Sequence, residues 1–89
     1  MTQKKQHREL DRVVGRLQWE ERNQASKSEG RYAVLTTRDN VHYKLYRSGE
    51  LPFNDSFFDS YIGHMVCVHG TIEEEGYLRI ESIEVQVIF

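Results

Sequence analysis

The sequence has one cysteine, one proline and no long apolar run, and each scarcity excludes a class of protein. A single cysteine, Cys67, cannot form an internal disulfide, which excludes the framework of a small disulfide-rich secreted module. No apolar stretch is long enough to cross a bilayer, and the first thirty residues lack the apolar segment of a signal peptide. We therefore expect a cytoplasmic protein that does not contact a membrane.

Signatures of catalysis and metal binding are also scarce. The four histidines form no His-Glu-x-x-His motif, and neither a Cys-x-x-Cys pair nor a phosphate-binding glycine loop is present. Cys67 and His69 share one face of a strand, but they have no third residue to orient them, and we expect Cys67 to be a small buried side chain. His64 and His69 lie an odd number of residues apart, so they face opposite ways on a strand. We expect neither an enzyme, nor a cofactor, nor a metal site.

The charge is divided between the two halves of the chain. The 89 residues suit one domain with one modest core, and the net charge is −2. Residues 1–47 carry 11 basic and 6 acidic side chains, whereas residues 48–89 carry 1 and 8. The halves are thus about +5 and −7. An anionic partner for the first half and a basic partner for the second both stay open.

The clearest strand lies in the stretch 61–72. Val66, Val68 and Ile72 alternate there with more polar side chains, the period of two of a half-buried strand. Gly63 is placed to form the turn that leads into the strand, and Gly70 to form a bulge or a sharp bend. Such bends allow a small sheet to close on itself.

Three further strands precede this stretch, and the last two of them form a hairpin. Residues 11–20 place Val13, Gly15, Leu17 and Trp19 on one face. Residues 31–37 and 41–47 are joined by Arg38-Asp39-Asn40, a turn whose Asp and Asn tolerate the left-handed conformation, so we predict a β-hairpin. In its second strand we expect one alternating set to face inward and the other outward. The inward set is Val41, Tyr43 and Leu45, and the outward set is His42, Lys44 and Tyr46.

The remaining segments are less regular. Residues 1–10 are polar and predict a flexible or helical N-terminal arm, and residues 21–30 predict a long loop. Asn54 or Asp55 is suited to cap a short helix that plugs one end of the sheet, with an aromatic and apolar face. That face comprises Phe57, Phe58, Tyr61 and Ile62. In the segment 77–89 the apolar phase changes near Glu81-Ser82, which predicts a bulge.

This order of elements predicts an all-β protein with one short helix, a five-stranded antiparallel Greek-key barrel of the OB-fold type. The motifs that carry the resemblance are Val14-Gly15-x-Leu17, Tyr32-x-Val34-Leu35, Tyr43-x-Leu45, Tyr61-x-Gly63-x-x-Val66-x-Val68-x-Gly70 and Leu78-x-Ile80-x-x-Ile83. In this layout the chain resembles small bacterial OB-fold proteins from about residue 12 to residue 86. We expect a single OB-fold-like domain over residues 11–89, after the arm.

The resemblance implies a binding module that uses its second and third strands and the neighbouring loops. The candidate ligand-binding residues are Arg31, Tyr32, Arg38, His42, Lys44, Tyr46 and Arg47, beside Arg22 and Lys27 of the first loop. Cations that neutralise phosphates and rings that stack on bases suit single-stranded nucleic acid. The acidic run 73–75 on the turn between the last two strands opposes this ligand. The alternative is a protein-interaction module or a homodimer that uses the acidic C-terminal half, a sheet edge and the apolar end 85–89.

Overall fold

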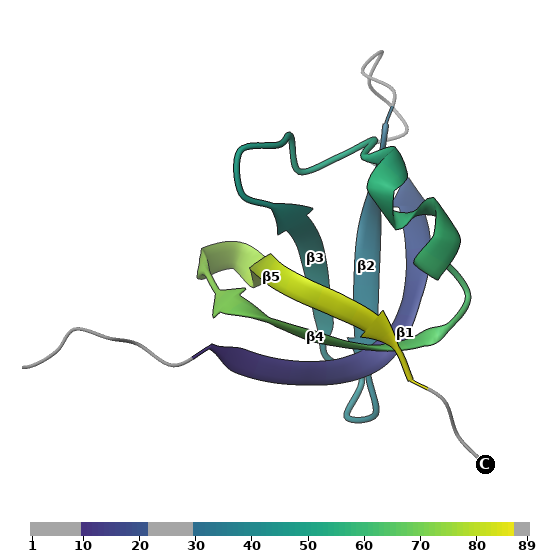
Figure 1. Cartoon of the computed structure of the whole chain (residues 1–89), viewed down its shortest axis with the longest axis vertical. Coiled ribbons are helices and arrows are strands. Elements are labelled where there is room, and N and C mark those ends of the chain that lie inside the picture. Colours follow the sequence, from purple (N-terminus) through teal and green to yellow (C-terminus); the bar gives the residue numbers. More distant parts are fainter. Residues whose placement is uncertain (1–9, 22–29, 87–89) are drawn as a thin grey trace, which may run out of the picture.

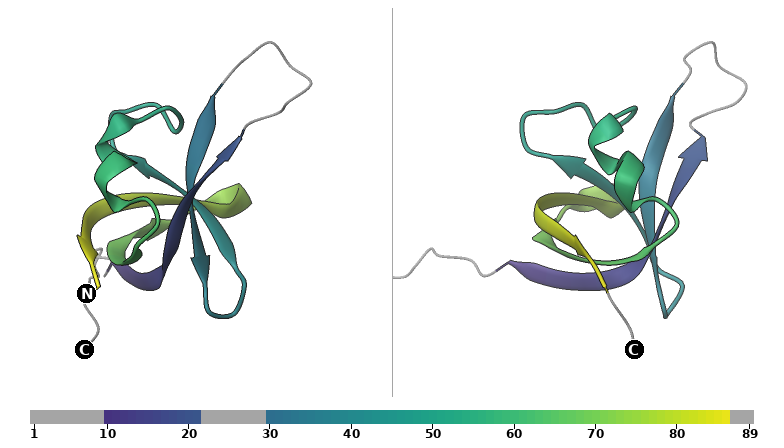
Figure 2. Two further views of the ribbon diagram at one scale, coloured as in Figure 1. Left: turned by 90° about the vertical axis from the view of Figure 1, so that its right-hand side faces the viewer. Right: turned by 45° about the vertical axis from the view of Figure 1, so that its right-hand side comes forward.

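A computed structural model describes residues 10–21 and 30–86, and in it the chain forms five strands whose sheet closes in a ring (Figures 1 and 2). The strands are β1 (Asp11–Glu21), β2 (Arg31–Thr37), β3 (His42–Arg47), β4 (Met65–Ile72) and β5 (Tyr77–Val85). Two short 3-10 segments, η1 (Ser56–Tyr61) and η2 (Glu74–Gly76), precede β4 and β5. All five predicted strands are present, although β4 begins at Met65 and the preceding residues 61–64 belong to η1 and a turn.

The ring follows the order β1-β2-β3-β5-β4. Four of its pairings are antiparallel, but β3 and β5 pair in parallel, from Lys44 with Tyr77 to Arg47 with Ile80. The prediction of a wholly antiparallel sheet was therefore wrong. A ring with an odd number of strands cannot alternate direction all the way round, so five strands must include one parallel pair.

The core fills the interior of the ring and follows the predicted alternation. Val13, Leu17, Leu35, Leu45 and Leu78 are among the buried side chains, and they come from four strands. Val66 and Val68 add the fifth strand, and Trp19 and Tyr43 pack against this cluster from its margin. Two residues that we expected inside, Val41 and Ile72, are exposed because they lie at ends of the sheet: Val41 precedes β3 and Ile72 is the last residue of β4.

The two predicted irregularities are the two sides of one bulge. His69 pairs with Ser82 and Gly70 pairs with Ile80, so Glu81 is the extra residue of β5. A Cβ atom on Gly70 would overlap the carbonyl oxygen of Arg79, which shows how closely the two backbones approach here. Because the extra residue bends the strand, the bulge directs β5 first along β3 and then away from it.

The predicted helix is a 3-10 segment of six residues and not an α-helix. It ends where Ile62 is extended and Gly63 adopts a positive φ of 88°, so no further helical turn can form. Asp55 caps it, and Phe58, which is 1% exposed, inserts into the core as the expected plug. Phe57 is 37% exposed and lies outside the core cluster, while Tyr61 and Ile62 pack against the core in part.

The hairpin turn between β2 and β3 has the predicted chemistry, since Asn40 adopts the left-handed conformation with φ 68°. Leu10 is exposed, whereas residues 1–9 of the predicted arm, 22–29 of the predicted long loop and 87–89 of the predicted apolar end lie outside the described residues. Within the described ranges, helices that have the length and apolar character needed to cross a membrane do not occur.

Candidate functional site

The site is built on the outside of the ring, where the side chains of β1, β2, β3 and β5 alternate with those of the core. The strand register sets these outward side chains in rows across the sheet. One row is Arg16, Thr36 and His42, and the next is Gln18, Lys44 and Tyr77, with the buried Val34 between Gln18 and Lys44. We call this surface the outer face, and it also includes Tyr32, Tyr46 and Arg79.

At one end of the outer face, three tyrosines surround a lysine. The ring of Tyr77 makes edge-to-face contacts with Tyr32 and Tyr46, with centroids 6.4 and 6.0 Å apart. The Nζ atom of Lys44 lies 5.0 Å from the ring centroid of Tyr32 and 4.9 Å from that of Tyr77. All four side chains are half-buried. This tyrosine–lysine cluster therefore offers a cation and aromatic surface within one small area.

An acidic residue borders the cluster, but its charge is shared. The hydroxyl of Tyr46 donates to Oε1 of Glu73 over 2.6 Å, and the guanidinium of Arg79 lies 3.5 Å from Oε2 of Glu73. The hydrogen bond to Glu73, together with burial, raises the pKa of Tyr46 above its usual value. Glu74 and Glu75 stay exposed on η2. We expected the acidic run 73–75 to oppose a phosphate backbone. The positive charge of Arg79 offsets the negative charge of one of these residues, Glu73.

The other end of the outer face holds a groove of about 550 Å³. Val14 and Met65 supply apolar surface, and the charged side chains that line it are Arg16 and Arg38. Gln18, Thr36 and Thr37 add neutral polar groups. The guanidinium of Arg16 donates to the carbonyl of Gly63 over 2.9 Å, and the Thr36 hydroxyl lies 3.0 Å from Nδ1 of His42. The groove is thus suited to an anionic group beside an apolar one.

Two of the predicted site residues lie away from the outer face. Arg31 and Arg47 are in phase with the buried residues of their strands, and both stand where those strands end or begin. The guanidinium of Arg31 lies 4.2 Å from the ring centroid of Trp19. Arg47 turns toward η1, where its guanidinium lies 4.4 Å from the ring centroid of Phe57.

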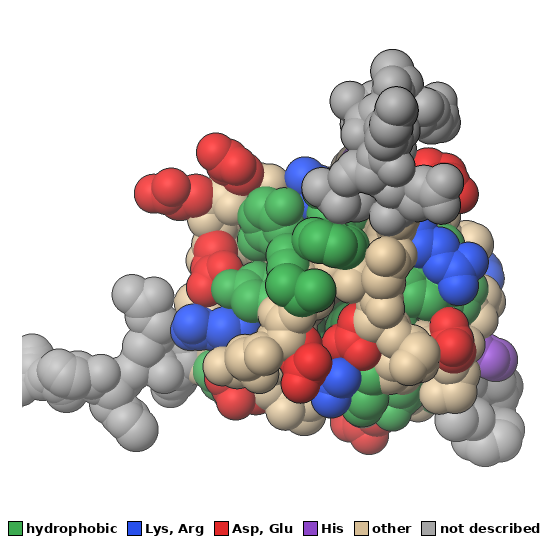
Figure 3. All heavy atoms as spheres, turned by 90° about the horizontal axis from the view of Figure 1, so that it is seen from above, with side chains coloured by type: hydrophobic (Ala, Val, Ile, Leu, Met, Phe, Trp, Pro, Cys, Tyr) green, Lys and Arg blue, Asp and Glu red, His purple; other side chains and the backbone are tan. Residues whose placement is uncertain are grey.

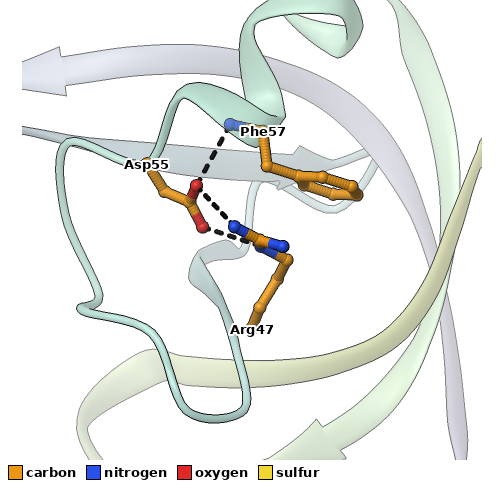
Figure 4. A network of polar contacts seen from close by, with 3 residues as sticks. All are labelled: Arg47, Asp55 and Phe57. Carbon is orange, nitrogen blue, oxygen red and sulfur yellow. Dashed lines mark hydrogen bonds and ion pairs between the residues drawn. The ribbon is translucent and has the colours of Figure 1, made fainter.

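The contacts of Arg47 form a network with Asp55 (Figure 4). Its Nε and a terminal nitrogen each donate over 2.9 Å to different oxygens of the Asp55 carboxylate. The same carboxylate accepts from the backbone N–H of Phe57 over 3.0 Å, which caps η1. The hydrogen bond from Arg47, and then the one from Phe57, holds the pKa of Asp55 below its usual value. Asp55 in turn raises the pKa of Arg47. The charge of Arg47 is therefore used to fix η1 against β3.

The structure thus places only some of the predicted site residues on the outer face. Tyr32, His42, Lys44 and Tyr46 share the outer face, and Arg38 joins it through the groove. Arg22 and Lys27 lie outside the described residues. Sequence reasoning missed the contributions of Arg16, Gln18, Thr36, Tyr77 and Arg79. The alternation of β1 indicates that Arg16 and Gln18 face outward, but Tyr77 and Arg79 reach the face only through the parallel pairing of β5 with β3.

Cys67 and His69, the local pair with the composition of a nucleophile and a base, lie on β4. Cys67 is 5% exposed, as expected for a small buried side chain. Nδ1 of His69 lies 3.5 Å from the hydroxyl of Ser82. Among the described residues, three or more His, Cys, Asp or Glu side chains do not gather into a group that could hold a metal ion.

Comparison with protein-family models, curated proteins and solved structures identifies no relative of this chain.

Proposed function

We propose that this chain is an OB-fold binding module that holds single-stranded nucleic acid across its outer face. The support for the fold is the five-strand ring, in which β4 lies beside β1, and the short segment η1 between the third and fourth strands. An OB-fold binds through the surface of its second and third strands, where Tyr32, Lys44 and Tyr46 of the tyrosine–lysine cluster lie, and the groove adjoins that surface along β2.

The observation that carries the proposal is the continuity of cations and rings along one surface. Arg16 and Arg38 line the groove, and the register leads from Arg16 through Thr36 to His42, and in the next row to Lys44. Cations spaced along a surface neutralise successive phosphates of a strand, and each phosphate contact releases counterions. Tyrosine rings at the end of that path supply stacking of about 1 to 3 kcal/mol per base.

The ligand is single-stranded because the bases must reach the rings. In a duplex the bases stack on one another, so tyrosine side chains on a sheet cannot stack on their faces. Lys44 lies over the rings of Tyr32 and Tyr77. A phosphate draws its ammonium group away, which uncovers ring surface for a base. The neutralisation of a phosphate and the stacking of a base are then coupled through the side chain of Lys44.

Titration of the protein into a fluorescein-labelled single strand of twelve mixed nucleotides, followed by anisotropy, tests the proposal. Three cations, Arg16, Arg38 and Lys44, give a slope of log affinity against log salt of about −2, so binding weakens by about twentyfold between 50 and 200 mM salt. The same strand annealed to its complement is the control and binds more weakly. Absence of binding at 50 mM salt, or equal binding of the duplex, contradicts the proposal.

A second experiment tests the role of the rings. Replacing Tyr32 with Leu keeps apolar volume but removes the stacking surface, so we expect affinity for the single strand to fall by about tenfold. The slope with salt stays unchanged, because the charge of the outer face is the same. An unaltered affinity would show that the rings do not contact the ligand.

A further inference from the structure

One edge of the sheet lies open within the described part of the chain. β5 pairs with β4 along nearly its whole length, from Leu78 to Val85, but with β3 only over residues 77–80. Beyond the bulge at Glu81, the side of β5 that faces away from β4 has no neighbouring strand among the described residues. Figure 1 shows this part of β5 crossing the molecule below η1. Unpaired backbone groups along such an edge are a template for another strand.

A groove of about 450 Å³ runs beside this edge. Phe57 and Tyr61 of η1 form one side, and Ile80 and Ile83 of β5 contribute apolar surface on the other. Arg47 and Glu81 are its charged lining residues. Phe57 is 37% exposed here, and Leu51, which is 66% exposed, lines an adjoining groove that also contains Arg47. The open edge therefore borders an apolar surface into which alternate side chains of an added strand can fit.

The charge around the edge is negative. Glu81 and Glu84 are exposed on β5, and Glu50 is exposed on the segment before η1. Arg47 offsets them only in part, because its guanidinium, which Glu50 also attracts, is bound by the Asp55 carboxylate at 2.9 Å. Seen from above, the molecule presents hydrophobic side chains bordered by acidic side chains, with Lys and Arg side chains among them (Figure 3). The groove, whose lining also includes Ser48 and Ser82, is thus bordered by the acidic groups of β5 and of the segment before η1.

We propose that the edge of β5 at residues 81–85 binds an extended segment of another protein, in which basic and apolar side chains alternate. The segment adds a strand to β5, its apolar side chains enter the groove at Phe57 and Ile83, and its lysines or arginines, on the other face of the added strand, meet Glu84. A second copy of this chain is disfavoured at the same edge, because pairing of β5 with β5 brings four glutamates together. This surface is separate from the outer face, so it operates whether or not nucleic acid binds there.

The test uses the ¹⁵N-labelled full chain and the probe peptide acetyl-Lys-Ile-Lys-Val-Lys-Ile-Lys-amide, titrated to millimolar concentration. We expect chemical-shift changes at the amides of residues 81–85 and at Phe57, and slower hydrogen exchange within 81–85. A peptide with glutamate in place of each lysine tests the charge and binds at least tenfold more weakly. A peptide N-methylated at all seven residues tests strand pairing, because it cannot donate along either edge, and its binding is lost.

Charge-reversal variants locate the partner surface. Glu81→Lys with Glu84→Lys weakens binding of the lysine peptide by about tenfold, as expected from the conversion of rim attractions into repulsions. Glu20→Lys with Glu74→Lys changes the net charge equally at exposed positions elsewhere and is the matched control. No binding at millimolar peptide, equal binding of the N-methylated peptide, or shifts centred on Lys44 instead of 81–85 overturns the proposal. So does light scattering that shows an oligomer whose 81–85 amides are already protected without peptide.

Discussion

The carboxylate of Asp55 performs two tasks at once, and substitution can separate them. It accepts from the Phe57 N–H as the cap of η1, and it accepts two hydrogen bonds from Arg47 of β3 (Figure 4). Asn at this position retains the cap but loses the charge, whereas Ala loses both. We therefore expect Asp55→Ala to be less stable than Asp55→Asn, and both to be less stable than the wild type.

The structure sets the size of the difference. Asp55 is well covered, with 11% of its side chain exposed, so the cap is not readily replaced by water. Replacing a capping residue with alanine costs about 1 kcal/mol of the free energy of unfolding. In a domain of this length that corresponds to a melting temperature about 5 °C lower for the Ala variant than for the Asn variant. Thermal unfolding followed by circular dichroism measures it.

The charge contribution of Asp55 follows pH with a definite sign. Its pKa in the folded protein lies below the reference value of 3.8, so the carboxylate stabilises the fold above that pH and loses this contribution as the pH falls through the folded pKa. The gap between wild type and Asp55→Asn is thus full at neutral pH and closes in acid. The gap between Asn and Ala persists, because the amide cap does not titrate. Asp59→Asn is the control for the loss of one negative charge, because it removes an exposed carboxylate of η1. Equal stability of the Ala and Asn variants would refute the reasoning.

Three further predictions concern the bulge, the cluster and the thiol. Gly70→Ala places a methyl group against the carbonyl of Arg79 and costs about 3 kcal/mol in urea denaturation, and a cost below about 1 kcal/mol would contradict the close packing of β4 on β5. Hydrogen bonding to Glu73 raises the pKa of Tyr46 above 10.0. The stabilisation of the fold by this bond is therefore complete below that pH and is lost as the pH rises through the folded pKa of Tyr46. The stability gap between wild type and Tyr46→Phe should therefore shrink in alkali, and a gap independent of pH would exclude the bond. Cys67 is buried, so a thiol reagent should label the folded protein much more slowly than the urea-unfolded protein, and equal rates would contradict its burial.

Much of the sheet was predictable because a period of two is a local property of the sequence. Val13, Leu17 and Leu35 lie inside as their spacing indicates, and the phase change at Glu81 marks the observed bulge opposite Gly70. The parallel pairing of β3 with β5 was missed because it depends on closing the ring, which no single segment encodes. The same omission hid Tyr77, which reaches Lys44 only through that pairing.

The candidate site was predictable only in part, because composition was given more weight than phase. Arg31 shares its phase with Ala33, and Arg47 shares its phase with Leu45, so alternation already placed both on the core side. They are tolerated there because each stands at an end of its strand, where an aromatic ring meets the guanidinium. The partner of Arg47, Asp55, lies in a loop, so the sequence indicates the cap but not the ion pair.

The most direct test of the outer face compares two substitutions that each remove one positive charge. Lys44→Ala removes a cation from the tyrosine–lysine cluster, whereas Arg31→Gln removes one that lies over Trp19, away from the face. The measurement is the slope of log affinity against log salt for the labelled single strand. We expect Lys44→Ala to reduce the slope by about 0.7 and Arg31→Gln to leave it unchanged. Equal effects of the two substitutions, or no effect of Lys44→Ala, would contradict binding at the outer face.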